Sequence, residues 1–190
     1  GGMSHAEQFK KLVAGGATMI QLREKKAAPR EFYESAGEVL ALAGKSGVKL
    51  IINDRADIAF ALKADGVHLG QDDLPPAAAR RLLGDKAIIG FSTHSVAQAV
   101  AAVKLPVDYI AVGPIFATAT KQNPDPAIGI EGLKQVREAI GNFPLAAIGG
   151  VTLENIGRVF DAGADSAAVI GDILSARDRI AERMKRFLAA

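Results

Sequence analysis

The sequence contains no cysteine, and this absence narrows the chemistry open to the protein. Without cysteine, the chain has no disulfide framework, no thiolate metal site and no cysteine nucleophile. The sequence also has no apolar run long enough to cross a membrane, and no segment resembles a signal peptide. We therefore expect a cytoplasmic protein.

The sequence also has no large excess of charge of one sign. Its 23 Lys and Arg residues nearly balance its 21 Asp and Glu residues, which leaves a formal net charge of +2. Basic stripes with interleaved aromatic residues are absent, so nothing suggests a nucleic acid or a membrane surface as partner. We expect small-molecule partners, and a homo-oligomer is compatible with the sequence.

Nothing in the sequence divides it into parts. It contains no Pro/Ser-rich linker, no block of like charge and no low-complexity tract. Its 190 residues are enough for one substantial hydrophobic core. We predict a single domain over residues 1–190.

What the sequence does contain is a regular alternation of short apolar runs and longer amphipathic segments. The short runs resemble strands that are buried on both faces. We expect strands at residues 17–21, 49–53, 66–69, 87–91, 109–112, 145–148 and 166–170. We expect helices to begin near Ser4, Pro29, Arg55, Pro75, Ser95, Gly129, Thr152 and Ala176, with Ser95 and Thr152 as N-caps and the two prolines in first turns.

Strands that are each followed by a helix indicate a (β/α)₈ TIM barrel or an open doubly wound sheet. Polar, chemically useful residues follow nearly every strand, whereas an open sheet concentrates them at one switch point, so we predict the α/β barrel. The chain enters a helix directly after Gly1-Gly2-Met3-Ser4, and a first strand is missing from the count. Either that strand is absent from this sequence or the barrel is closed in another way.

The first expected strand is followed by two cations. Gln21, Arg23 and Lys25 lie at its carboxyl end, where parallel α/β proteins bind substrates. A guanidinium and an ammonium group together suit a phosphate or diphosphate. A solvated charged turn is the alternative. We favour substrate binding because later strand ends carry matching chemistry.

Acidic residues follow the next two strands. Asn53 and Asp54 come after the second strand, and Asp72 and Asp73 come after the third. If these strands are neighbours, Asp54 and one of the later pair face each other and form a Mg²⁺ site of the usual kind. Each aspartate alone could be a turn residue or a helix cap, as Asp73 would be before Leu74. Together, beside the cations, they favour metal.

The longest polar connection follows the fifth strand. Thr118, Thr120 and Lys121 supply two hydroxyl groups and a cation that could close over a diphosphate. Loops of this length are often lids or binding loops. A plain surface loop is the alternative.

The last two strands are followed by glycines, in Gly149-Gly150 and Ile170-Gly171. In barrels, the loops after the final two strands often bind phosphate through backbone N–H groups, and glycine allows a close approach. Glycine pairs are also common simply as turns. Their position after these strands favours the phosphate site.

Ser92 and His94 follow the fourth expected strand. Ser92 could contact a substrate, and a histidine has a pKa suited to proton transfer near neutrality. At a helix start, however, a histidine such as His94 is more often structural. His68 lies within a strand, and we interpret it as a packed core residue.

These residues, taken together and in order, resemble the thiamine phosphate synthase family over essentially the whole chain. The motifs that carry the resemblance are Gln21-Leu22-Arg23-Glu24-Lys25, Asn53-Asp54, Gly66-Val67-His68-Leu69-Gly70-Gln71-Asp72-Asp73, Gly113-Pro114-Ile115-Phe116, Thr118-Ala119-Thr120-Lys121 and Gly149-Gly150. The resemblance implies a (β/α)₈-barrel transferase. Such an enzyme joins 4-amino-2-methyl-5-hydroxymethylpyrimidine diphosphate to a thiazole phosphate, and it releases diphosphate and, from a carboxylated thiazole, carbon dioxide.

The resemblance also implies roles for individual residues. Asp54 and Asp73 would hold Mg²⁺, and Ser92 would contact the pyrimidine. The pyrimidine diphosphate would be bound by Gln21, Arg23, Lys25, Asn53 and Lys121. The thiazole phosphate would be bound by Thr118, Thr120, Gly150 and the backbone of Ile170 and Gly171. Arg23, Lys25, Lys121 and Ser92 would carry the catalysis, which proceeds by dissociation of the diphosphate.

Two departures from the family pattern stand out. The first strand of the family, with its Ile-Thr-Asp-like motif, is absent from this sequence. Gly171 stands where many relatives have a serine, so we expect weaker binding of the thiazole phosphate through backbone N–H groups alone.

Two other functions remain open. A thiazole tautomerase on the same barrel would use His94 as its proton carrier, but it would leave Arg23, Lys25 and Lys121 without a task. A non-catalytic phosphate-ligand binding protein would bind without turnover and without Mg²⁺, because fold alone does not determine function.

Overall fold

A computed structural model describes residues 2–118 and 126–190 of the chain. Its strands are β1 Met19–Leu22, β2 Lys49–Asn53, β3 Gly66–Leu69, β4 Ile88–Thr93, β5 Tyr109–Val112, β6 Leu145–Ile148 and β7 Ser166–Ala168. Its helices are α1 His5–Ala14, α2 Pro29–Ser46, α3 Ala56–Leu62, α4 Pro76–Leu83, α5 Val96–Ala102, α6 Gly129–Ile140, α7 Ile156–Asp161, α8 Gly171–Leu174, the 3₁₀ helix η1 Arg177–Arg179 and α9 Ile180–Leu188.

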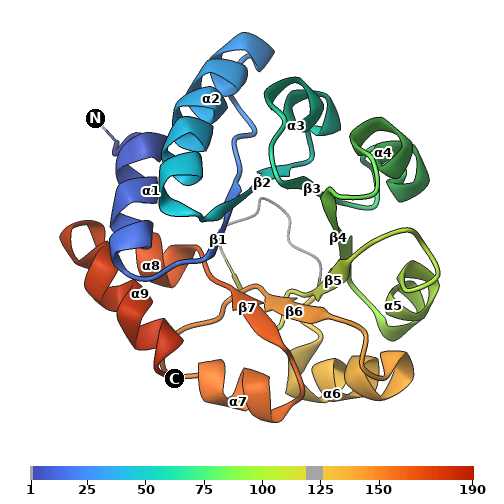
Figure 1. The fold of residues 1–190 in the computed structure, drawn as a ribbon. Helices are drawn as coiled ribbons and strands as arrows, with labels where there is room; N and C mark the ends of the chain where they lie inside the picture. The colour runs from blue at the N-terminus through green and yellow to red at the C-terminus, as the bar shows by residue number, and fades with distance from the viewer. Residues whose placement is uncertain (1, 119–125) are drawn as a thin grey trace.

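The strands form one parallel sheet in the order β1 to β7, and the helices surround it (Figure 1). This confirms the expected α/β barrel class and the expected number of strands. Within the described ranges β7 does not pair with β1, so both are edge strands of a curled sheet. The first and last helices, α1 and α9, pack together on the outside of this edge.

Several expected boundaries are wrong. The helix expected to begin with Thr152 as N-cap begins instead at Ile156, after the cap residue Asn155. Strand β4 continues to Thr93, so Ser92 lies within the strand and not after it. Strand β7 ends at Ala168, which leaves Ile170 outside it. The N-cap at Ser95 is confirmed, since its side chain accepts a hydrogen bond from the backbone N–H of Gln98.

The two faces of the sheet carry different residues. Alternate strand residues such as Leu50 and Ile52 pack with helix residues such as Phe32 into the main hydrophobic core. The other alternate residues face the inside of the barrel. There, register places His68 beside Gly90, and Gly90 beside Tyr109. The barrel interior therefore contains polar groups where the outer core is apolar.

A repeated contact ties strands together at their amino ends. Asp108 directly precedes β5, and its carboxylate accepts a hydrogen bond from the backbone N–H of Ile89 in β4 at 2.7 Å. The same carboxylate forms an ion pair with Arg80 at 2.7 Å. Since the backbone group is at a buried strand end, this carboxylate holds the register of β4 against β5.

Two other strand pairs repeat this contact. Asp165 accepts from the N–H of Leu145 at 2.8 Å and pairs with Arg137 at 2.6 Å. Asp65 accepts from the N–H of Leu50 at 2.9 Å and pairs with Lys49 at 2.7 Å. We call these three carboxylates, Asp65, Asp108 and Asp165, the strand clamps. They stabilise the end of the barrel opposite to the carboxyl ends of the strands.

No helix in the described ranges is both long and apolar enough to cross a membrane.

Candidate active site

A pocket of about 270 Å³ lies at the carboxyl ends of β1, β2 and β3. Residues from the ends of these three strands meet there, as parallel strands require. The pocket is lined by Glu24, Lys25, Ala27, Phe32, Asn53, Asp54, Arg55 and Asp73. The structure therefore brings together four of the predicted site residues: Lys25, Asn53, Asp54 and Asp73.

Asp54 is placed by a tight turn at the end of β2. Its backbone has φ 63°, a left-handed conformation that aspartate tolerates better than most residues do. Its backbone N–H donates to the carbonyl of His68 in β3 at 2.8 Å. Its carboxylate forms an ion pair with Lys25 at 2.9 Å. The turn thus directs one acid from β2 toward a cation from the β1 exit.

Asp73 is the second acid of the pocket. The backbone N–H of Gly70 donates to its carboxylate at 2.6 Å. The helix α4 begins at Pro76 after the cap residue Pro75, so the alternative of Asp73 as a helix cap is wrong. Of the two candidates Asp72 and Asp73, Asp73 is the one that lines the pocket.

The two carboxyl groups interact with each other. Burial raises the pKa of Asp73, and the neighbouring carboxylate of Asp54 raises it further. Two carboxylates that repel each other would be stabilised by a divalent cation between them. Among the described residues no cluster of three or more His, Cys, Asp or Glu side chains forms a metal site. Two carboxylates fit Mg²⁺, which completes its shell with water and phosphate oxygens.

Glu24 shapes the loop that carries the cations, a role that sequence analysis missed. Its carboxylate accepts a hydrogen bond from the backbone N–H of Lys26 at 2.8 Å, and this bond lowers its pKa. His5 of α1 lies 3.9 Å from the same carboxylate. Gln21 lies in β1 with its side chain exposed, and Arg23 follows, half-buried.

Ser92 is held from inside the barrel. Its hydroxyl lies 2.8 Å from Nε2 of His68, and Nδ1 of His68 lies 2.9 Å from the hydroxyl of Tyr109. His68 is buried, as expected of a core residue, but both its ring nitrogens are hydrogen-bonded. Burial lowers the pKa of His68 to about 4 and raises the pKa of Tyr109 well above its ordinary value. Both groups are therefore neutral at neutral pH.

The loops after β5 and β6 pack against each other. The backbone N–H of Phe116 donates to the carbonyl of Gly149 at 3.0 Å. Gly150 has φ 66°, and a Cβ on it would lie 2.6 Å from the carbonyl oxygen of Ala117. Only glycine fits this close approach. Thr118 follows at the end of the described segment, half-buried, whereas Thr120 and Lys121 lie outside the described residues.

The loops after β6 and β7 are also joined. The backbone N–H of Leu153 donates to the carboxylate of Asp172 at 3.1 Å, and Asp172 forms an ion pair with Arg183 of α9. Asp172 follows Gly171, the first residue of α8. Gly150 and Gly171 are therefore carried by two loops in direct contact. The Asp172 contact was not predicted.

His94 is bound to the barrel backbone. Its Nδ1 donates to the carbonyl oxygen of Gly113 at 2.6 Å. This contact agrees with the structural interpretation of His94.

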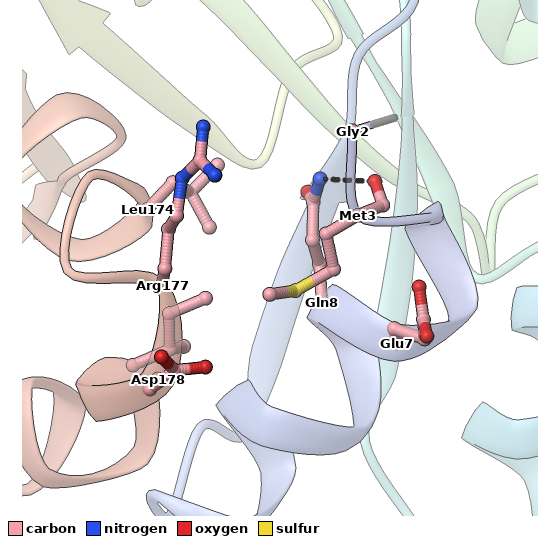
Figure 2. Close-up of a pocket in the computed structure, with 8 residues that line it drawn as sticks. Gly2, Met3, Glu7, Gln8, Leu174, Arg177 and Asp178 are labelled. Atoms are coloured by element: carbon pink, nitrogen blue, oxygen red, sulfur yellow. Dashed lines mark hydrogen bonds between the residues drawn. The ribbon is translucent and has the colours of Figure 1, made fainter.

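A larger pocket of about 480 Å³ lies elsewhere, between the amino-terminal segment and the region from α8 to α9. Figure 2 shows Met3 and Gln8 facing Leu174, Arg177 and Asp178 across it. None of the predicted site residues lines this pocket. The predicted site residues that share a pocket, Lys25, Asn53, Asp54 and Asp73, all line the smaller one, where acid and cation converge.

Known proteins resemble this chain over most of its length. The family model TMP-TENI, thiamine monophosphate synthase, matches residues 2–173. The thiamine-phosphate synthase of Syntrophomonas wolfei is 47% identical over 184 residues, which are 97% of this chain and 88% of that protein. That of Koribacter versatilis is 51% identical over 165 residues, 87% of this chain and 77% of that protein.

Solved structures also resemble the fold of this chain. The thiamine phosphate pyrophosphorylase of Pyrococcus furiosus superimposes with a TM-score of 0.87 at 34% identity, covering 97% of this chain and 88% of that one. A 3-hexulose-6-phosphate synthase superimposes with a TM-score of 0.71 at 20% identity, which shows a shared fold only.

Proposed function

Since the chain belongs to the thiamine monophosphate synthase family, we propose that it joins 4-amino-2-methyl-5-hydroxymethylpyrimidine diphosphate to a thiazole phosphate. The products are thiamine phosphate and diphosphate, with carbon dioxide when the thiazole is carboxylated. The observation that carries this proposal is the meeting of Lys25, Asp54 and Asp73 in one pocket at three adjacent strand ends. A diphosphate-releasing transferase needs such a combination of cation and metal-binding acids.

The residues of this chain divide the work between two anionic substrates. Gln21, Arg23, Lys25 and Asn53 bind the pyrimidine diphosphate from the β1 and β2 ends, and Lys121 adds a further cation. Ser92 contacts the pyrimidine ring. The thiazole phosphate is bound by Thr118, Thr120, Gly150, Ile170 and Gly171. The contact between the loops that carry Gly150 and Gly171 supports this division.

Bond cleavage and bond formation then follow in order. The C–O bond between the pyrimidine methylene and the diphosphate breaks, and its electron pair leaves with the diphosphate. Arg23, Lys25 and Lys121 stabilise the charge that develops on the leaving group. The thiazole nitrogen donates its lone pair to the methylene cation and forms the new C–N bond. The residues that hold the two substrates in line supply the orientation.

Asp54 and Asp73 would hold Mg²⁺. When bound, this ion would neutralise charge on the departing diphosphate. The carboxylate of Asp54 raises the pKa of Asp73, and this proximity of the two acids supports their assignment as the metal ligands.

The alternatives have less support. A tautomerase would need His94 as proton carrier, and the bond from its Nδ1 to the Gly113 carbonyl supports a structural role instead. A binding protein without turnover is distinguished by the assay below. The cytoplasmic location and the homo-oligomer remain predictions.

The test is the formation of thiamine phosphate from the two substrates, with Mg²⁺ and with excess chelator. We expect product only with the metal.

Asp54→Asn and Asp73→Asn should each lower kcat by about 100-fold or more without unfolding the protein. Asp72→Asn is the matched control, since Asp72 does not line the pocket, and it should retain activity. Equal rates in chelator would refute the metal assignment, and ligand binding without product would favour the binding protein.

A further inference from the structure

Three side chains from adjacent strands form a hydrogen-bonded chain inside the barrel. Tyr109 of β5 contacts Nδ1 of His68 in β3 at 2.9 Å, and Nε2 of His68 contacts the hydroxyl of Ser92 in β4 at 2.8 Å. Ser92 stands near the carboxyl end of β4, whereas Tyr109 begins β5. The chain therefore runs from deeper in the barrel toward the substrate end.

The packing leaves this chain little freedom. His68 is 5% exposed. A Cβ on Gly90 would lie 2.2 Å from the Cζ atom of Tyr109 and 2.4 Å from Nδ1 of His68, so both rings rest directly on the backbone of Gly90. The backbone of Ser92 is also held, because Nε2 of Gln71 donates to its carbonyl at 2.6 Å. The sheet therefore fixes the positions of the side chains of Tyr109, His68 and Ser92.

The direction of the hydrogen bonds follows from the available partners. In the described part of the chain, the hydroxyl of Tyr109 is hydrogen-bonded to His68 and to no other group. If Nδ1 of His68 donated to Tyr109, the phenolic hydrogen would lack an acceptor inside the barrel, which is unfavourable. If Tyr109 donates to Nδ1 instead, Nε2 carries the ring hydrogen. Nε2 then donates to the oxygen of Ser92, whose own hydrogen is left for another acceptor.

We infer that His68 is a positioning residue: Tyr109 fixes its ring as the Nε2–H tautomer, and His68 thereby directs the hydroxyl hydrogen of Ser92 outward to the bound substrate. The acceptor on the substrate is a ring nitrogen of the aminopyrimidine or an oxygen of its diphosphate. This inference rests on the proposed function for the identity of that acceptor. The sequence pattern by itself predicts only a packed core residue at His68.

A double-mutant cycle tests the inference by turnover. Ser92→Ala, His68→Asn and Tyr109→Phe are measured singly, and each of the last two is also combined with Ser92→Ala. In His68→Asn, the amide of asparagine lies near the position of Nδ1, but no group reaches Ser92 in place of Nε2. This variant should therefore lower kcat/KM by about tenfold. His68→Gln, whose amide reaches the position of Nε2, should restore part of the loss. Tyr109→Phe should lower kcat/KM by about threefold, since the ring can then adopt either tautomer.

The cycle separates positioning from simple structural damage. If His68 and Tyr109 act through Ser92, their substitutions should change kcat/KM by less than about twofold once Ser92 is alanine. Losses that multiply in the double variants would overturn the inference. Melting temperatures of all variants show whether each protein is folded. If His68→Asn does not fold, the more conservative Tyr109→Phe still tests the inference.

A second measurement needs neither substrate nor turnover. The ¹⁵N chemical shifts of the His68 ring report which nitrogen carries hydrogen. We expect the Nε2–H tautomer in the native protein and a mixture in Tyr109→Phe. A native Nδ1–H tautomer would overturn the inference. If the protein forms no thiamine phosphate, the proposed function fails while the tautomer measurement still decides the inference.

Discussion

At the scale of single residues, the site depends on a few backbone and side-chain choices. Asp54 adopts φ 63° at the end of β2, and this turn brings its carboxylate to Lys25 at 2.9 Å. Asp73 is held by the N–H of Gly70, so it lines the pocket in place of its neighbour Asp72. Glu24 holds the loop after β1, which carries Lys25, because its carboxylate accepts a hydrogen bond from the backbone N–H of Lys26. Each of these backbone conformations and hydrogen bonds is local, but its contribution to the site depends on the residue that it brings into contact.

His68 gives a residue-scale prediction on pH and stability. Burial lowers its pKa to about 4 from the ordinary histidine value of about 6.5, so the unfolded chain binds more protons than the folded protein between these pH values. Stability is therefore expected to fall as pH is lowered from about 6.5 to about 4, by up to roughly 3 kcal/mol from this group. In His68→Gln this contribution is absent, and the fall should be shallower. Urea unfolding at a series of pH values measures both proteins, and equal slopes would contradict the assignment.

At the scale of elements, different sets of neighbouring strands are tied at the two ends of the sheet. The strand clamps join β2 to β3, β4 to β5 and β6 to β7 at their amino ends. At the carboxyl ends, the loops after β5, β6 and β7 contact one another through Gly149 and Asp172. Because the strand clamps stabilise the amino ends of the strands, the loops at the carboxyl ends are available to bind ligands.

The clamps give an element-scale prediction. Asp165→Ala would leave the N–H of Leu145 and the guanidinium of Arg137 without this carboxylate. We expect a loss of about 1–3 kcal/mol, seen as a fall in Tm of roughly 3–9 °C. Asp165→Asn should lose less, because its amide oxygen can still accept from Leu145.

Asp161→Ala, at the exposed end of α7, is the matched control and should change stability by less than about 0.5 kcal/mol. Thermal unfolding followed by circular dichroism compares the three variants. An unchanged Tm in Asp165→Ala would show that the clamp contributes nothing to stability.

At the scale of the whole molecule, the pocket exists only when the sheet is assembled. Its lining comes from the ends of β1 and β2 and from the segment after β3, together with Phe32 of α2. A ligand that bridges these elements binds the folded protein and not the unfolded chain. Binding should therefore be visible as stabilisation.

This leads to a prediction for a simple ligand. Inorganic diphosphate with Mg²⁺ at 100 times its dissociation constant should stabilise the protein by about 2.7 kcal/mol. Diphosphate with excess chelator should stabilise it less. In Asp54→Asn the Mg²⁺-dependent part should disappear. Thermal shift measurements test this directly, and an equal shift in that variant would argue against Asp54 as a metal ligand.

Much of this organisation could be predicted from the sequence. Short apolar runs alternate with amphipathic segments, and this pattern was enough to predict seven parallel strands, since the period of side chains differs between strand and helix. Parallel strands place their carboxyl ends together, so Lys25, Asn53, Asp54 and Asp73 could be predicted to meet from their positions after successive strands. Local sequence carries this information because it depends on spacing along one element at a time.

The contacts between residues far apart in the sequence depend on the tertiary structure alone. The bonds from His68 to Ser92 and Tyr109 join residues 24 and 41 positions apart, and the strand clamp of Asp165 reaches a backbone group 20 positions away. The register between strands determines these partners, and register arises from packing of the complete sheet against its helices. For this reason the sequence determined which residues lie at the strand ends, whereas the fold determined which of them touch.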